Sequence, residues 1–316
     1  MHAHLLSSHT TMSPRPLLTI TFIRHGESTD NTKDIWAGWK DAPLSNHGMN
    51  QARACGESLS DIRFQTIWAS PLQRAFSTAQ AIYDVQPDPK PSFKTSPHLR
   101  EQHFGIAEGK KWIVEWIPGM SLEDHIAQGL FPALHSRSEK FPEGESLDDL
   151  RTRATKAIEE CVVPHIRDAA RTASSGGHIA LVSHGLCISE MLPALLRKDA
   201  SGVEPKSSYR GLMNTGWARV TIEVKGWGGK EPLVFADNDI PPLIIKVTEF
   251  DRHEHLDKVK RQKGGIGSAA FDPKQKDIRA FFGGAKLGSQ ADVSASTKEE
   301  GRSESNVQDE VNVDIQ

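Results

Sequence analysis

Three short apolar runs, each followed by a helix-forming segment, set the main constraint on how this chain can fold. The runs cover residues 17–23, 64–70 and 177–185 and are rich in β-branched and aromatic residues. Runs of this length and composition predict buried strands. Helix-forming residues occupy 46–59 and 71–83, and Pro71 would stand at the first helical position, where proline is tolerated.

The second half of the chain continues the alternation. A long amphipathic stretch opens at Ser146, which forms the pattern of a capping box with Asp149. One more helix and two β-rich runs follow, at 186–196, 217–224 and 243–250. Strands that alternate with helices predict an α/β fold, a three-layer sandwich with a mainly parallel central sheet flanked by helices.

The composition divides the chain into three regions. We expect a flexible N-terminus over 1–16, one domain over 17–256 and a tail over 257–316. Beyond Asp257 the sequence shifts to Lys, Gly, Ser and Glu with few large apolar residues, which is typical of disorder.

The overall composition excludes several classes of protein. A net charge of -3 gives no electrostatic reason to expect direct nucleic-acid binding. No stretch approaches the roughly 20 apolar residues of a membrane helix, and the first residues lack the pattern of a secretory signal. The 3 cysteines are widely spaced, which favours reduced thiols over a disulfide framework. We therefore expect a protein of the cytoplasm, the nucleus or both.

Two of the predicted strands end in the same dipeptide. His25 with Gly26 follows the first run, and His184 with Gly185 follows the third. In an open parallel sheet, ligands bind beyond the carboxyl ends of the strands. If the two strands are neighbours, both imidazoles lie at one edge within a few ångströms of each other. That pair favours a catalytic site more strongly than either histidine alone.

Two further side chains are candidates for the same edge. Arg74 lies in the first turn of the helix after the second strand, where a helix N-terminus and a guanidinium could bind an anion together. The alternative is that Arg74 covers its helix surface and keeps its charge in water. Glu101 lies between turn elements, and taken alone it reads as a solvated loop charge.

The order of six motifs resembles the histidine phosphatase superfamily, in its phosphoglycerate mutase-like branch. The motifs are, in chain order, RHGES, DAPLSNHGMNQA, SPLQRAFSTA, LREQHFGIAEG, FPEGES and LVSHG. The resemblance covers about residues 17–256. The combination is specific even though each motif is not.

The resemblance implies a nucleophile and an acid/base. His25 would attack the substrate phosphorus and become a phosphohistidine, which requires a neutral imidazole. Glu101 would protonate the leaving oxygen and then activate the water that cleaves the phosphohistidine.

The same resemblance implies a set of phosphate ligands. Arg24, Arg74 and His184 would surround the phosphoryl oxygens, where charge develops in the transition state. His184 could be protonated there, because a phosphate dianion favours the imidazolium. Asn31 would donate to another oxygen, and Gly38 matches a position where the backbone approaches the ligand. No metal and no cofactor is required, because arginines and imidazoles supply the positive charge.

The family contains both phosphatases and cofactor-dependent mutases. The start of the chain, with RHGESTDN and AGWKDAPLS, is very like the mutases. Mutases, however, carry a longer basic segment after the acid/base motif that holds a second phosphate. Here the interval 110–146 has few arginines, and FPEGESLDDLRTR resembles the phosphatases. We expect a phosphatase acting on a small phosphate monoester, with a phosphoglycerate mutase as the alternative.

The interval also holds large apolar residues at helical spacing. They are Trp112, Ile113, Trp116, Ile117 and Leu130. Such residues could form a lid over the substrate or could pack in a core or an interface, and the sequence does not separate the two.

The tail contains a motif for a function of another class. Gln275, Ile278, Phe281 and Phe282 follow the order of the peptide with which many proteins bind the replication sliding clamp. A disordered segment could fold into a turn there and bury its apolar side chains in a pocket of the partner. The two phenylalanines could equally dock on the protein's own surface. An interaction protein that uses 275–282 to bind a nuclear partner is therefore the second hypothesis.

Overall fold

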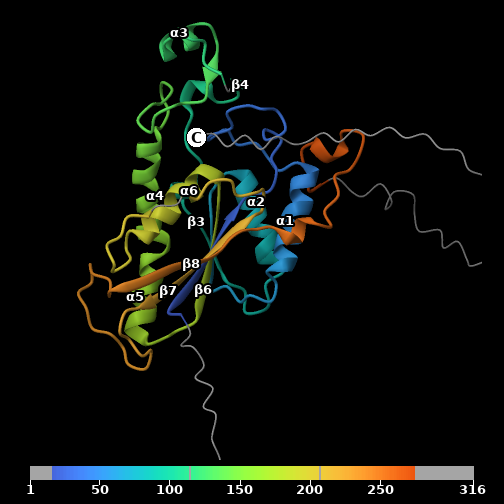
Figure 1. Ribbon diagram of the computed structural model, residues 1–316. Coiled ribbons are helices and arrows are strands. Elements are labelled where there is room, and N and C mark those ends of the chain that lie inside the picture. Colours follow the sequence, from blue (N-terminus) through green and yellow to red (C-terminus); the bar gives the residue numbers. More distant parts are fainter. Residues whose placement is uncertain (1–15, 114, 206–207, 275–316) are drawn as a thin grey trace, which may run out of the picture. The chain divides into compact units, whose positions relative to one another are not determined.

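A six-stranded mixed sheet forms the centre of the protein (Figure 1). The computed structural model describes residues 16–113, 115–205 and 208–274. The strands run in the order β3-β2-β6-β1-β7-β8. Their bounds are β1 (Leu18–Arg24), β2 (Thr66–Ala69), β3 (Ser92–Thr95), β6 (Gly177–Ser183), β7 (Trp217–Val224) and β8 (Leu243–Arg252). Strands β3, β2, β6 and β1 pair in parallel, while β7 pairs antiparallel with both β1 and β8.

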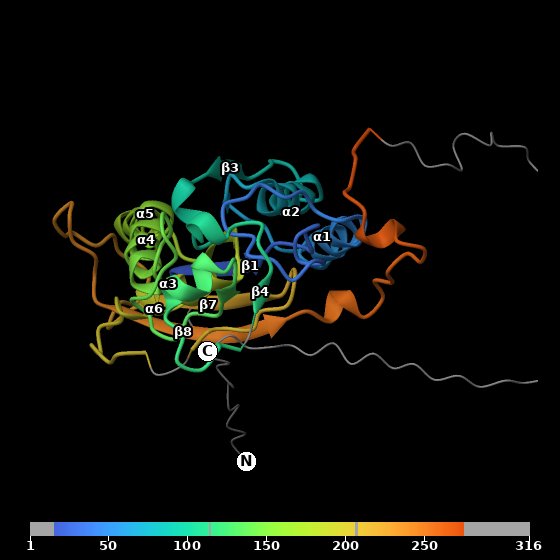
Figure 2. The same ribbon diagram turned by 90° about the horizontal axis from the view of Figure 1, so that it is seen from above.

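Helices cover both faces of this sheet (Figures 1 and 2). On one face lie α1 (Asn46–Ser58) and α2 (Gln73–Asp84). On the other lie α4 (Leu147–Cys161), α5 (Val163–Thr172) and α6 (Gly185–Leu196). The predicted three-layer α/β architecture with a mainly parallel sheet is confirmed.

Alternation along β1 explains why the sheet has a helical layer on each side. Ile20 and Phe22 belong to the hydrophobic core under α4 and α6, whereas Ile23 belongs to the core under α1 and α2. Successive side chains of a strand point to opposite faces, so an apolar run buries both. The neighbouring strand β6 repeats the pattern with Leu181 and Val182.

Two helix boundaries differ from those expected. Pro71 is not the first helical residue, because the Ser70 N–H still bonds to the Val182 carbonyl and Leu72 is extended as the N-cap of α2. The stretch after Ser146 forms two helices, α4 and α5, with Pro at the start of α5. Proline has no backbone N–H to donate to the carbonyl four residues before it, which explains why the first helix ends there. The capping box of Ser146 with Asp149 is confirmed.

The interval after Lys110 forms a small subdomain. It contains β4 (Trp112–Ile113), α3 (Leu122–Ala127) and β5 (Phe131–Pro132), and β4 pairs with β5. Trp36 fixes it from the loop after β1: its indole Nε1 donates to the Phe131 carbonyl at 3.1 Å. Trp112 packs against the buried cluster around Trp36. This large apolar side chain therefore packs in a core.

The compact unit extends past the boundary expected at Leu256 and ends at Phe271. The reason is that residues 257–271, although polar, contact α1 and the chain before it through backbone hydrogen bonds. The motif at 275–282 lies outside the described residues, so its role stays a prediction. In the part of the chain that the structure describes, every helix is too short or too polar to cross a membrane.

Two glycines allow α1 to touch the loop after β1. A Cβ on Gly48 would lie 1.9 Å from the Glu27 carbonyl oxygen, and one on Gly26 would lie 2.5 Å from the Gly48 carbonyl oxygen. Real side chains do not fit at these distances. The backbone contact therefore fixes α1 against the loop that follows the strand.

We predict that Gly48→Ala lowers the free energy of unfolding by roughly 1–3 kcal/mol, because the added methyl group overpacks the contact. Helix propensity alone would act in the opposite direction, by about 1 kcal/mol. Urea unfolding measures the change. The control is Gly228→Ala, where the added Cβ meets nothing within 4 Å. Equal stability of the two variants would contradict the steric explanation.

Candidate active site

The two histidines predicted at strand ends lie side by side. Strands β1 and β6 are direct neighbours, and Arg24 at the end of β1 pairs with Ser183 at the end of β6. His25 and His184 are the next residues of each strand, and their ring centroids are 4.9 Å apart. Both side chains are buried, at 4% and 0% exposure. The parallel pairing therefore brings the two imidazoles together as expected.

The imidazole of His25 is held in one tautomer by its own loop. Its Nδ1 lies 2.7 Å from the Gly26 carbonyl oxygen, which only accepts hydrogen bonds, so Nδ1 carries a proton. Burial lowers the pKa of His25 well below its ordinary value, and the charges of Arg74 and Arg24 lower it further. The ring is therefore neutral at pH 7, with a free lone pair on Nε2 for nucleophilic attack.

The imidazole of His184 is also neutral at pH 7. Burial lowers its pKa well below the ordinary value, and Arg74 and His25 act in the same direction. Its Nε2 lies 2.9 Å from the Ser70 hydroxyl oxygen, whereas its buried Nδ1 has no hydrogen-bond partner. A bound phosphate dianion would raise the pKa of His184, because the negative charge favours the imidazolium. The predicted protonation of His184 therefore depends on bound phosphate.

Two buried arginines supply fixed positive charge. Arg74 is 1% exposed and donates to the carbonyl oxygens of Lys40 at 2.9 Å and Gly38 at 2.7 Å. Arg24 donates to the Leu212 carbonyl oxygen at 2.5 Å, and its Nε has no partner. Within the described residues neither guanidinium forms an ion pair with a carboxylate. Their charge is therefore available to attract an anion.

The side chain of Glu101 lies at the N-terminus of α6, the helix that begins directly after His184. One carboxylate oxygen accepts from the backbone N–H groups of Cys187 and Gln102, each at 3.0 Å, and the other accepts from Leu186 at 3.2 Å. The first N–H groups of a helix have no partner within the helix, so a carboxylate satisfies them. Glu101 is thus a fixed group of the site and not a freely solvated loop charge.

Asn31 and Gly38 lie on the long loop between β1 and α1. The Asn31 Oδ1 accepts from the backbone N–H and the hydroxyl of Ser28, both at 2.9 Å, so this oxygen is occupied within the loop. Gly38 has φ of 48° and a Cβ there would lie 2.1 Å from Glu108 Oε1. The Gly38 carbonyl accepts from Arg74, so Gly38 and Arg74, two of the predicted phosphate ligands, are in direct contact.

Sequence reasoning missed the two residues that hold the Glu101 loop. Arg153 on α4 is 8% exposed and donates to the carbonyl oxygens of His98, Arg100 and Glu101. It also forms a bidentate pair with Glu145 at 2.7 and 2.8 Å. A helical arginine normally extends into solvent, so nothing in the sequence around Arg153 predicts this role. The one indication in the sequence is that its partner Glu145 belongs to the motif FPEGES.

A resident metal is not evident among the residues that the structure describes, since they contain no cluster of three or more His, Cys, Asp or Glu suited to one. The positive charge of the site comes from Arg24 and Arg74, which both act on His25 and His184. The arrangement has an unprotonated nucleophile, fixed cations and one carboxylate. Such a site can transfer a phosphoryl group.

Comparison with known proteins identifies a family. The model of the histidine phosphatase superfamily (branch 1) matches residues 20–231. A phosphoglycerate mutase of Schizosaccharomyces pombe is 31% identical over 185 residues, which are 56% of this chain and 77% of that protein. A fructose-2,6-bisphosphatase TIGAR B of Danio rerio is 25% identical over 269 residues, 76% of this chain and 97% of that protein.

Solved structures share the fold. A mycobacterial glucosyl-3-phosphoglycerate phosphatase in complex with VO3 superposes with a TM-score of 0.52 at 20% identity. The match covers 74% of this chain and 98% of that one. Another structure, called mycobacterial hydrolase 1, has a TM-score of 0.53 at 21% identity.

We predict that Arg153→Lys loosens the Glu101 loop, because one ammonium cannot replace a guanidinium that bridges three carbonyls and a carboxylate. Hydrogen exchange should increase at the amides of Gln102 and His103. Arg153→Met, which leaves Glu145 without its buried partner, should lower the free energy of unfolding by about 3–5 kcal/mol.

The control is Arg151→Lys, because Arg151 is exposed on the same helix. It should change neither the exchange rates nor the unfolding midpoint. Exchange in Arg153→Lys that matches wild type would show that the loop is held by other contacts.

Proposed function

The chain belongs to the histidine phosphatase superfamily, and from this premise we propose that it hydrolyses small phosphate monoesters through a phosphohistidine on His25. The observation that carries the proposal is the state of that imidazole. It is neutral, protonated at Nδ1 and placed beside His184, Arg24 and Arg74.

In the first step Nε2 of His25 attacks the substrate phosphorus. The P–N bond forms as the P–O bond to the leaving group breaks, and the protonated carboxyl of Glu101 gives its proton to the leaving oxygen. Arg24, Arg74 and His184 stabilise the charge on the equatorial oxygens. These donors are already fixed by backbone carbonyls or by Ser70, so little reorganisation is needed.

In the second step water cleaves the phosphohistidine. The Glu101 carboxylate takes a proton from water, whose oxygen attacks phosphorus while the P–N bond breaks. Inorganic phosphate leaves, and His25 recovers its lone pair on Nε2. The N–H groups of Leu186 and Cys187 hold the side chain of Glu101 in place for this step.

The cations of the interval 110–146 favour a phosphatase over a mutase. They are Lys110, Lys111, Arg137 and Lys140. Arg137 is bound to Glu190 at 2.9 Å and to Asp148 at 3.1 Å, and Lys140 is bound to Asp149 at 3.0 Å. Two of the four charges are therefore neutralised within the protein. A bisphosphate intermediate would be held weakly, so the phosphohistidine would be open to water.

We predict that His25→Ala lowers turnover roughly 10⁴-fold or more, because the covalent route is lost. Phosphorus NMR of wild type with a mixture of phosphoglycerates and sugar bisphosphates provides the measurement. Inorganic phosphate should appear with wild type only, and the resonance that disappears identifies the substrate class.

A matched control is His165→Ala on α5, which should behave as wild type. Interconversion of phosphoglycerates without phosphate release would make the protein a mutase. Phosphate release by His25→Ala at the wild-type rate would refute the nucleophile.

We predict that Glu101→Gln slows hydrolysis of an alkyl phosphate by about 10²–10⁴-fold, because a poor leaving group needs a proton. With 4-nitrophenyl phosphate, whose leaving group needs none, the formation of the phosphohistidine should be slowed much less. Glu123→Gln, at an exposed position of α3, is the control. Equal slowing of this step for both substrates would exclude Glu101 as the acid.

A further inference from the structure

Residues 254–271, here called the C-terminal strap, lie outside the matched family region and along α1 (Figure 1, orange). Three hydrogen bonds attach the strap to the start of α1 and the residues before it. Asn46 donates through its backbone N–H to Ala269 and through its side chain to Ile266, and the Phe271 N–H donates to Leu44, all at 2.9 Å. The strap therefore forms part of the compact unit.

An ion pair connects the strap to the loop that follows His25. The guanidinium of Arg261 forms a bidentate contact with the carboxylate of Glu27, with one N···O distance of 3.0 Å. Glu27 is only 9% exposed, and its Oε1 also accepts from the Ser45 hydroxyl at 2.7 Å. A carboxylate this buried needs such partners, so the position of Glu27 depends on Arg261.

Glu27 is one peptide away from the group that fixes the nucleophile. The carbonyl that accepts from Nδ1 of His25 belongs to Gly26, in the peptide that joins Gly26 to Glu27. The Gly26 N–H donates to Thr78 at 3.0 Å, and the Glu27 N–H donates to Gln51 at 2.9 Å. A shift of Glu27 would turn this peptide and move its carbonyl away from the imidazole.

A second strap contact reaches the other side of His25. Nε2 of His255 lies 2.9 Å from the Thr215 hydroxyl oxygen, and that hydroxyl donates to the Asn214 carbonyl at 2.6 Å. The His25 carbonyl in turn accepts from the Thr215 N–H at 3.2 Å and from the Asn214 side chain at 3.0 Å. The strap thus contacts residues on both sides of the nucleophile's backbone.

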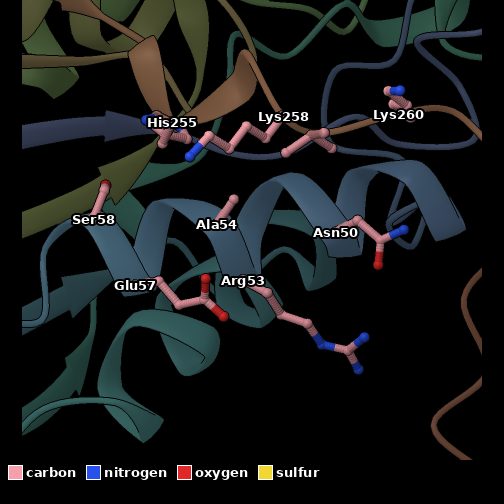
Figure 3. A pocket seen from close by; sticks show the side chains of 9 residues that line it. Asn50, Arg53, Ala54, Glu57, Ser58, His255, Lys258 and Lys260 are labelled. Carbon is pink, nitrogen blue, oxygen red and sulfur yellow. The ribbon is translucent and has the colours of Figure 1, made fainter.

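A groove of about 550 Å³ lies between α1 and the first part of the strap (Figure 3). Arg53, Lys258 and Lys260 line it, but Figure 3 shows the side chains of Arg53 and Lys260 pointing away from each other. The cations do not converge on one point, so the groove is not a built anion site.

We propose that Arg261 is a positioning residue for His25: by holding Glu27, it keeps the Gly26 carbonyl on Nδ1 and so keeps Nε2 free to attack. The expected effect on the rate of nucleophilic attack rests on the proposed function, whereas the expected effect on the tautomer of His25 does not. The residue responsible comes from a segment beyond the matched family region.

Nitrogen-15 NMR of histidine-labelled protein measures the tautomer directly, with His25→Ala to assign the signals. In wild type Nδ1 of His25 should resonate as a protonated nitrogen and Nε2 as an unprotonated one. In Arg261→Met the two shifts should move toward each other, because both tautomers become populated. Arg261→Lys should restore part of the difference, and Lys260→Met should match wild type. Unchanged His25 shifts in Arg261→Met would overturn the proposal.

Glu27→Gln provides a second route to the same state if Arg261→Met unfolds. The glutamine can still accept from Ser45 but has no charge for Arg261. It should change the His25 shifts in the same direction. The double variant should then change them no more than Arg261→Met does, because both substitutions remove one interaction. Wild-type shifts in Glu27→Gln would overturn the proposal as well.

Single-turnover kinetics with 4-nitrophenyl phosphate separates positioning from a structural role. Formation of the phosphohistidine should slow by about tenfold or more in Arg261→Met, because a misplaced nucleophile loses its alignment. Its hydrolysis and the KM should stay within about twofold of wild type, because Glu101 and the phosphate ligands are untouched. Equal slowing of both steps would overturn the positioning role. Absence of a phosphohistidine in wild type would refute the proposed function, while the tautomer shifts would still decide the inference.

Discussion

The parallel pairing of β1 with β6 is the constraint on which the rest of the site depends. Because Arg24 stands opposite Ser183, the next residue of each strand places an imidazole at the same edge, with ring centroids 4.9 Å apart. Both strands are buried on both faces, so a shift of register by one residue would move every apolar side chain to the wrong layer. The cores on the two sides of the sheet therefore also fix the geometry of the histidine pair.

The second requirement is to bury positive charge without neutralising it. Arg74 is almost fully buried, yet its partners are the carbonyls of Lys40 and Gly38 and not carboxylates. Carbonyl dipoles satisfy the N–H groups and leave the net charge in place. Burial lowers the pKa of His25 and of His184, and the charge of Arg74 lowers both further, so that both imidazoles are unprotonated when an anion approaches. The charge of the buried arginine thus attracts an anion and also contributes to the low pKa of the imidazoles.

The sequence predicts those features that depend on local pattern. Apolar runs predict the central strands. His25 and His184 each follow such a run, and because the carboxyl ends of parallel strands meet at one edge of the sheet, the sequence also predicts that the two histidines lie together. Arg153 and Arg261 could not be found in this way. Each acts through contacts with residues far away in sequence, and a charged side chain in a polar stretch gives no sign of being held. For the same reason, composition gave no sign that the compact unit continues to Phe271.

The C-terminal strap gives a physical reason for a domain to extend past its catalytic core. The loop after β1 buries the polar side chains of His25, Glu27 and Ser28, and buried polar groups need hydrogen-bond partners. A backbone contact with Gly48 holds it from one side, while Arg261 and His255 reach it or its supports from the strap. Since the site needs one tautomer of one imidazole, small rotations of a single peptide matter. In the proposed mechanism, the strap would therefore act on the tautomer of His25 through the backbone, without contact with the substrate.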